Sequence, residues 1–316
     1  MIDKSLAKRV PIVFFGVDRF PALPLEKLLE EGYNVQAIFA APDKDARGGK
    51  KKAPVAKILG EKYDVPVLQP EKGREIIGEL IGRFGEDKRL LPDGEHKGTL
   101  PLGVLVSYGK MIPDEVLEWF KPMPIINIHP SLLPKYRGSS PVESAILNGD
   151  AETGVSIIKL VAEMDAGEVL ASAKISVAAD ETSASLYDKA ARVGWELVQE
   201  LIPKLVETDG QLKGAGQDHK LATFTPRFDK AEAELTGAKT AAELERKVRA
   251  FDTNPRAFLM HDGKRFAVHG GLVVDARQTP LDIKSSDGKF YHPTIITPEG
   301  QKAMAIADYL RGVDRG

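Results

Sequence analysis

The sequence predicts an α/β protein: a Rossmann-like, doubly wound parallel sheet followed by a C-terminal β-barrel (OB-like) domain. Over about the first two hundred residues, short apolar runs alternate with stretches of helical apolar spacing, the pattern of parallel strands joined by helices. Beyond the Gly-rich polar stretch Asp209–Lys220, short β-like segments are separated by closely spaced turns. That second pattern indicates a small barrel or sandwich.

The elements follow in order along the chain. The predicted strands are apolar runs bounded by Gly, Pro or polar residues: Val10–Gly16, Val35–Ala41, Val65–Leu68, Leu102–Val106, Ile125–Ile128 and Val155–Val161. The predicted helices carry their apolar residues on one face: Leu23–Glu31, Val55–Tyr63, Arg74–Arg83, Thr182–Glu207 with Pro203 as a candidate kink or break, and Ala241–Phe251. Glu86–Thr99 is read as a polar surface insertion without an assigned function. We expect a catalytic domain at 1–208, a linker at 209–222 and the barrel at 223–316.

Composition excludes several classes of function. The 316 residues suit two domains, and the net charge of −2 means that any nucleic-acid contact must come from local basic patches. The chain has no cysteine, which excludes disulfides, thiol nucleophiles and thiolate metal sites. No run approaches the roughly 18 apolar residues of a membrane span, and we read no signal peptide. We therefore expect a cytoplasmic protein that does not enter a membrane.

Three side chains that can do chemistry lie where strands are predicted to end. Alternation along the strand at Ile125–Ile128 places Asn127 and His129 on the same side. Asp165 lies in the turn after the strand at Val155–Val161. Ligands of open parallel sheets collect at the carboxyl ends of the strands, so we expect an amide, an imidazole and a carboxylate to meet in one cleft.

The arrangement favours direct acyl transfer over other reactions. Ser131 and Ser139 are available as nucleophiles, but neither lies in a Gly-x-Ser-x-Gly elbow. The six histidines include no His-x-His or His-x-x-x-His pair, so we expect no metal. In acyl transfer to an amine the substrate supplies the nucleophile, and Asn127 and His129 would donate hydrogen bonds to the oxyanion. Asp165 would hold the tautomer of His129 or take part in proton removal.

Each of these residues also has a structural explanation. Asn127 could bond a loop backbone, His129 could be a satisfied structural histidine, and Asp165 could be a turn former. Their joint occurrence at strand ends, beside a stiff Ser-Leu-Leu-Pro loop, favours the catalytic interpretation.

An ordered motif of about forty residues points to one family. It comprises Asn127-Ile-His129-Pro-Ser-Leu-Leu-Pro134-Lys-Tyr-Arg137-Gly138, Pro141, Gly149-Asp150, Thr153-Gly154 and Asp165-x-Gly167. The motif resembles that of enzymes that use 10-formyltetrahydrofolate as formyl donor. The resemblance implies that Asn127, His129 and Asp165 are catalytic and that Ser131, Leu132, Leu133 and Pro134 border the folate site. It also implies direct amine attack without a metal or a covalent enzyme intermediate. Glycinamide ribonucleotide, nucleotide-sugar and methionyl-tRNA formyltransferases share the motif, so it leaves the acceptor open.

Features outside this motif resemble the methionyl-tRNA formyltransferase family. The loop Pro42–Lys52 is crowded with basic residues and glycines, suited to phosphates or to solvent. It is similar to that family's loop into the tRNA acceptor stem, although Lys44 replaces the first Arg and Arg47 precedes the glycines with one residue fewer. Arg47, Lys50, Lys51 and Lys52 are therefore the candidate tRNA-binding residues.

The C-terminal part supports the same family. Ala222–Pro226, Leu244–Phe251, Asn254-Pro255 and Pro298–Gly312 resemble that family's barrel in order and spacing. Two tryptophans usual in the family are absent: Leu235-Thr-Gly and Arg256-Ala stand in their places. The resemblance implies initiator methionyl-tRNA as acceptor and a monomeric enzyme. The alternative enzyme is a nucleotide-sugar N-formyltransferase with the same donor, and the alternative of another class is a catalytically silent folate- or RNA-binding protein.

Overall fold

The computed structural model describes residues 4–16, 20, 22–45, 51–86, 100–253 and 255–313. The predicted site residues Arg47 and Lys50, and all of the insertion after Glu86 up to Thr99, lie outside this set. The chain forms two compact units, each built from several segments. Unit 1 comprises Met1–Arg137, Gly154–Ile175 and Asp188–Thr223, and unit 2 comprises Gly138–Thr153, Ser176–Tyr187 and Phe224–Gly316. The domain limits at 208 and 222 stay a prediction.

Among the described residues, unit 1 is organised around a seven-stranded sheet of order β10-β9-β7-β6-β1-β2-β5. Its strands are β1 (Ile12–Gly16), β2 (Val35–Phe39), β5 (Val67–Leu68), β6 (Leu102–Val106), β7 (Ile125–His129), β9 (Glu152–Lys159) and β10 (Val169–Ser176). The five strands from β5 to β7 pair in parallel. β9 pairs with β7 antiparallel, so the predicted parallel sheet is confirmed with a mixed edge. β10 lies beside β9 at this edge of the sheet, and Lys159 N donates to Glu168 O at 3.0 Å.

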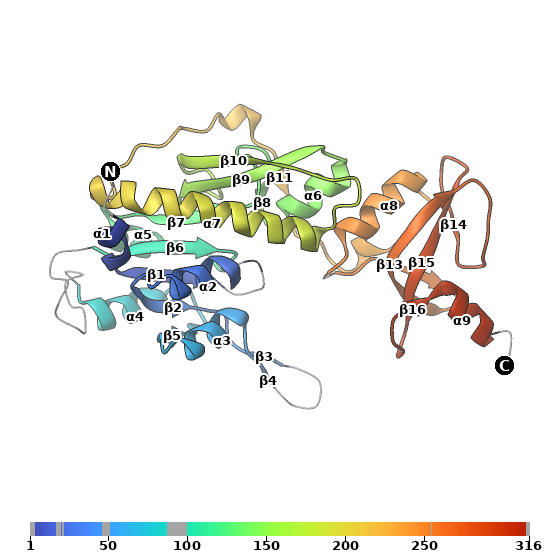
Figure 1. The fold of residues 1–316 in the computed structure, drawn as a ribbon, viewed down its shortest axis with the longest axis horizontal. Helices are drawn as coiled ribbons and strands as arrows, with labels where there is room; N and C mark the ends of the chain where they lie inside the picture. The colour runs from blue at the N-terminus through green and yellow to red at the C-terminus, as the bar shows by residue number, and fades with distance from the viewer. Residues whose placement is uncertain are drawn as a thin grey trace. The chain divides into compact units, whose positions relative to one another are not determined.

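Helices cover the sheet (Figure 1). They are α1 (Lys4–Arg9), α2 (Ala22–Glu30), α3 (Val55–Lys62), α4 (Glu75–Phe84), α5 (Asp114–Phe120) and α7 (Ser183–Glu207). α4 and α5 bury Ile76, Leu80 and Trp119 in one cluster with Phe15 and Phe39, whose rings stack at 4.9 Å between centroids. α5 was not predicted, although it ends in the apolar pair Trp119-Phe120.

α7 lies beside the strands of the sheet as the long yellow helix of Figure 1. The helix continues through Pro203 without interruption, so the alternative that Pro203 breaks the helix is wrong. Gly194 lets this helix approach β7 closely, because a Cβ at Gly194 would lie 2.7 Å from Cγ2 of Ile128. The Ile128 side of β7 is thereby packed against α7.

Unit 2 has its own core and an antiparallel sheet, which confirms a separate small β domain. In the described part of this unit the sheet has five strands, ordered β12-β13-β15-β14 with β16 paired to β15. They are β12 (Phe258–His261), β13 (Lys264–Val274), β14 (Ile283–Lys284), β15 (Phe290–Pro298) and β16 (Met304–Ala305). The helices of this unit are α6 (Pro141–Asn148), α8 (Ala241–Ala250) and α9 (Ile306–Val313). Their buried faces share a cluster with Phe266, Val268 and Tyr291.

Four further two-residue strands lie outside the two larger sheets: β3 (Lys44–Asp45), β4 (Lys51–Lys52), β8 (Arg137–Gly138) and β11 (Phe224–Thr225). β3 and β4 form an antiparallel pair. Two 3-10 turns lie at His219–Leu221 and Ala231–Ala233. Among the helices in the described residues, none has the length and apolarity needed to cross a membrane.

Candidate active site

β7 carries two of the three predicted catalytic side chains. Asn127 and His129 alternate with Ile126 and Ile128, so they project from the face opposite to α7. Ile125 shares their face and belongs to the cluster formed by α4 and α5. The prediction ended this strand at Ile128, whereas the strand includes His129. Both functional side chains therefore have a backbone fixed by sheet pairing.

The structure brings Asp165 to both of them. Asn127 Nδ2 donates to Asp165 Oδ1 at 3.3 Å, and His129 Nδ1 lies 3.7 Å from Asp165 Oδ2. All three groups are largely buried, with exposed fractions of 7% for Asn127 and 4% for His129 and 12% for the side chain of Asp165. Asp165 has a φ of 49°, a left-handed conformation that Asp tolerates better than most residues. The turn containing it folds back from the end of β9.

His129 is held through its other ring nitrogen. Nε2 lies 2.9 Å from the carbonyl oxygen of Tyr136, and a carbonyl can only accept, so Nε2 carries a hydrogen and donates. Nδ1 is then the nitrogen that faces the carboxylate of Asp165. Tyr136 has a φ of 62°, which turns its carbonyl toward the ring. In this geometry Nδ1 is the ring nitrogen left to exchange a proton with a substrate, beside Asp165.

Asn127 leaves an acceptor unused. Its Oδ1 is buried and has no hydrogen-bond partner among the described residues. A buried amide oxygen without a partner is costly, which indicates a place where a substrate N–H can bind. The second hydrogen on Nδ2 is also available, because an amide nitrogen has two and one is directed to Asp165. The site therefore offers one donor and one acceptor from the same amide.

The Ser131–Pro134 loop is fixed by hydrogen bonds to Lys135 and to Ser156 on β9. Ser131 is fully buried, and its hydroxyl donates to the carbonyl of Lys135 at 2.6 Å. Ser156 on β9 holds both ends of the loop: its Oγ donates to Ser131 O at 2.8 Å and accepts from Leu133 N at 3.1 Å. The hydroxyl of Ser131 thus stabilises the loop. The contact of Ser131, Leu132, Leu133 and Pro134 with folate stays a prediction.

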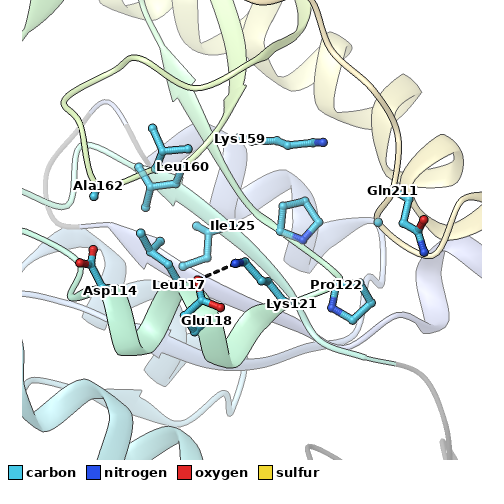
Figure 2. Close-up of a pocket in the computed structure, with 13 residues that line it drawn as sticks. Asp114, Leu117, Glu118, Lys121, Pro122, Ile125, Lys159, Leu160, Ala162 and Gln211 are labelled. Carbon is cyan, nitrogen blue, oxygen red and sulfur yellow. Dashed lines mark hydrogen bonds and ion pairs between the residues drawn. The ribbon is translucent and has the colours of Figure 1, made fainter.

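A cavity of about 690 Å³ lies on the Ile125 side of the sheet, between α5 and the start of the Asp165 loop. Figure 2 shows Leu117, Ile125 and Leu160 around it, with Glu118 and Lys121 paired at its edge at 2.5 Å. Ile125 is two residues before Asn127 on the same strand face. The sequence interpretation missed this cavity because α5 was not assigned. The amphipathic run Asp114–Phe120 is the signal that could have found it.

The basic loop is anchored at its base. Asp43 accepts two hydrogen bonds from Lys57 Nζ, at 3.0 and 2.8 Å, and one from Gln69 Nε2 at 2.8 Å. The hydrogen bond from Lys57 lowers the pKa of Asp43 below its usual range, and the bond from Gln69 adds to this. Lys51 and Lys52 follow on β4 and are exposed. The structure thus fixes the start of the loop and presents two of its four predicted tRNA-binding cations to solvent.

Among the residues that the structure describes, no group of three or more His, Asp or Glu side chains could hold a metal ion.

Comparison with known proteins identifies the family. The formyl transferase family matches residues 8–202, and the formyl transferase C-terminal domain matches residues 227–314. A methionyl-tRNA formyltransferase of Lactobacillus johnsonii is 33% identical over 95% of this chain and 95% of its own length. The enzyme of the same name from Halalkalibacterium halodurans is 31% identical over 95% of this chain and 94% of its own.

Solved structures share the fold. HypX from Aquifex aeolicus in complex with tetrahydrofolic acid has a TM-score of 0.62 at 18% identity, covering 98% of this chain and 48% of that chain. This chain therefore spans about half the length of HypX. An N-formyltransferase from Helicobacter canadensis, in complex with folinic acid and dTDP-3-aminofucose, has a TM-score of 0.62 at 16% identity and covers 90% of this chain and 98% of that chain.

The fold, the site and the match over residues 8–202 define a formyl-transferring enzyme. Within that class the chain belongs to the methionyl-tRNA formyltransferase family, as shown by relatives that are 31% to 33% identical over nearly its whole length.

Proposed function

We propose that this enzyme transfers the formyl group of 10-formyltetrahydrofolate to the α-amino group of methionyl-initiator-tRNA. The observation that carries the proposal is the meeting of Asn127, His129 and Asp165 on one face of β7, in a chain with nearly full-length methionyl-tRNA formyltransferase relatives. The two parts of the proposal have different support. The site supports the chemistry, and the family supports the acceptor.

The proposed mechanism follows from which ring nitrogen of His129 and which amide hydrogen of Asn127 are not used in hydrogen bonds among the described residues. The unprotonated amine attacks the formyl carbon, and the formyl oxygen becomes an oxyanion. The second Nδ2 hydrogen of Asn127 and a proton at Nδ1 of His129 can stabilise that charge, since Nε2 is committed to Tyr136. Asn127 Oδ1 can accept from the amine and orient its lone pair. Asp165 stabilises the protonated ring of His129 and assists the removal of the amine proton.

Collapse of the intermediate completes the transfer. The bond between the formyl carbon and the folate nitrogen breaks, and the proton lost by the amine ends on that nitrogen. Formyl leaves the donor and joins the acceptor, so the reaction needs no oxidant and no covalent enzyme intermediate. The residues of this chain hold and move protons and stabilise the oxyanion.

The cavity beside α5 suits the ring system of the donor. A volume of about 690 Å³ falls within the range of small-molecule sites. Apolar Leu117, Ile125 and Leu160 can cover flat ring faces, and Asp114 and Lys159 supply polar groups at the lining. Ile125 in the lining precedes Asn127 by two residues on one strand face, and Asn127, His129 and Asp165 are not among the lining residues.

The acceptor part of the proposal rests on the basic loop and the second domain. Lys51 and Lys52 are exposed on β4, and Arg47 and Lys50 belong to the same loop sequence. Leu221–Gly316 carries a formal charge of +2, which leaves −4 for the rest of a chain with −2 in total. A mildly basic second domain is compatible with phosphate contacts.

The deciding experiment compares acceptors. Wild-type protein and 10-formyltetrahydrofolate are incubated with charged initiator methionyl-tRNA or with amino-sugar nucleotides, and formylated product is measured. We expect product with the tRNA. Product only with a sugar nucleotide would support the rival function, a nucleotide-sugar N-formyltransferase. The solved N-formyltransferase in complex with dTDP-3-aminofucose is an example of that class. No product with any amine, together with retained RNA binding, would support a silent binding protein.

The basic loop can be tested through salt dependence. Replacing Lys50, Lys51 and Lys52 with Ala should raise KM for tRNA and flatten its dependence on salt, because fewer counterions are released on binding. KM for the folate donor should change little. A Lys62→Ala/Lys72→Ala variant is the control, since both lysines are exposed outside the loop. A KM that is unchanged at every salt concentration would show that the loop is only solvated.

A further inference from the structure

Gln217, in the polar stretch at 209–222, has a fully used carboxamide. Its Nε2 donates to the carbonyl oxygens of Asp165 and Gly167, both at 2.8 Å. Its Oε1 accepts from Nε and Nη2 of Arg137 at 3.1 and 2.8 Å. An amide has two donor hydrogens and two acceptor lone pairs, so Gln217 is saturated by these bonds.

The donor side of Gln217 holds the turn that presents Asp165. This turn is constrained: Asp165 has a positive φ of 49°. Gly167 is pressed against β9, because a Cβ there would lie 1.8 Å from the carbonyl oxygen of Lys159. Two carbonyl oxygens of such a turn converge on one amide nitrogen. Loss of that nitrogen would leave both carbonyls without this partner and release the turn.

The acceptor side of Gln217 leads to His129. Arg137 is fully buried and directly follows Tyr136, whose carbonyl accepts from His129 Nε2. The guanidinium of Arg137 also lies 3.3 Å from Glu163 Oε1, in the segment that leads into the Asp165 turn. The side chain of Gln217 thus connects the backbone of the turn that presents Asp165 to the guanidinium of Arg137, the residue that follows Tyr136.

We propose that Gln217 is a positioning residue that sets the separation and orientation of His129 and Asp165. It acts through the backbone of the Asp165 turn and through the guanidinium of Arg137 rather than by contact with substrate. The inference deepens the proposed function and rests on it for the reaction that is measured. A carboxamide is required because a carboxylate of the same size would keep the bonds from Arg137 but direct oxygen lone pairs at two carbonyl oxygens.

The test uses full-length Gln217→Met and Gln217→Glu proteins. Each should lower kcat for formyl transfer by about tenfold to a hundredfold, since small misplacements of catalytic groups are costly. KM for donor and acceptor should stay within about threefold. Gln199→Met is the matched control: Gln199 on α7 also donates two hydrogen bonds, to Glu31 at 3.1 and 2.9 Å. This variant should keep the wild-type kcat.

A second measurement does not depend on the acceptor. In protein with ¹⁵N-labelled histidine, the ring nitrogen resonances of His129 should change in Gln217→Met and stay unchanged in Gln199→Met. Wild-type kcat with unchanged His129 resonances in Gln217→Met would overturn the inference. If the wild type formylates no amine, the proposed function fails while the resonances still decide the role of Gln217. Should Gln217→Met lose its fold, Gln217→Glu provides the same two measurements.

Discussion

Among the described residues, two His–Asp pairs are buried, one in each unit, and they differ in their geometry and in the groups beside them. In unit 2, His292 Nδ1 donates to Asp282 Oδ1 at 2.8 Å. Asp282 also accepts from the backbone of Gln278 and from both the backbone and hydroxyl of Thr279. Its carboxylate is therefore saturated by the protein.

The pair in unit 1 is looser. His129 Nδ1 lies 3.7 Å from Asp165 Oδ2, beyond hydrogen-bond length, and Asn127 Oδ1 beside them lacks a partner among the described residues. Saturation leaves the unit 2 pair nothing to offer a substrate, whereas Asn127 Oδ1, which lacks a partner among the described residues, is an acceptor beside the unit 1 pair. The difference explains why one His–Asp pair is structural and the other is the candidate for catalysis.

The largest expected effect is on kcat, which should fall when His129 is replaced but not when His292 is replaced. His129→Ala should lower kcat for formyl transfer by about 10²- to 10⁴-fold, because it removes an oxyanion donor and proton carrier. His292→Ala should leave kcat within about twofold when assayed below its melting temperature. Comparable losses in both variants would break the comparison.

A smaller effect on rate is expected from the carboxylates. Asp165→Asn should lower kcat by about a hundredfold, since an amide cannot stabilise a protonated His129 or take up a proton. Asp282→Asn should have a near wild-type kcat. Steady-state kinetics of the two purified variants at one temperature decide this, and an active Asp165→Asn enzyme would remove Asp165 from the proposed mechanism.

The effects on the free energy of unfolding should have the opposite order, with the larger loss in Asp282→Asn. Asp282→Asn should lower the free energy of unfolding by about 1–3 kcal/mol, because an amide NH₂ would face groups that themselves donate. Asp165→Asn should change it by less than about 0.5 kcal/mol, since Asn also tolerates a positive φ. Urea unfolding followed by circular dichroism measures both values. Equal losses would mean that the Asp165 pair is as structural as the other.

The smallest expected effect is the loss of stability around Asp282 at acidic pH. Burial would raise the pKa of Asp282, but the bonds from Thr279 Oγ1, Gln278 N and His292 outweigh it and lower the pKa below 3.8. A lowered pKa in the folded state gives stability that is present above pH 3.8 and is lost as pH falls through the folded value. Hydrogen exchange at the amides of Gln278 and Thr279 should therefore accelerate in that acidic window. Asp282→Asn should weaken this dependence, and wild-type exchange that does not respond to pH beyond its intrinsic rate would contradict the assignment.

Much of the fold could be predicted because strands and helices here have clear apolar periods. The strand at Leu102–Val106 was predicted with its observed bounds, and the helix at Val55–Tyr63 differs by one residue. The helix α7 was predicted from its apolar face but not its continuity through Pro203, because packing along the sheet compensates for the missing N–H. The β9–β7 pairing was not predicted, since strand direction depends on how the chain returns.

The site divides in the same way. Strand alternation placed Asn127 and His129 on one side, and the turn after the Val155–Val161 strand added Asp165. The carbonyl of Tyr136, the carboxamide of Gln217 and the cavity beside α5 came only from the structure, because each joins residues through folded loops that have no periodic pattern.

The sequence by itself determined the α/β class and the small second β domain, which depend on local periodicity that can be read along the chain. Residue types at the strand ends predicted an amide, imidazole and carboxylate set for acyl transfer, and the family resemblance made the transferred group formyl. Only the tertiary structure decided which nitrogen of His129 faces Asp165, and that an amide oxygen without a partner among the described residues, Oδ1 of Asn127, lies beside this pair. Those properties depend on distances between residues as far apart as Arg137 and Gln217, and such distances are set by the packing of the whole domain.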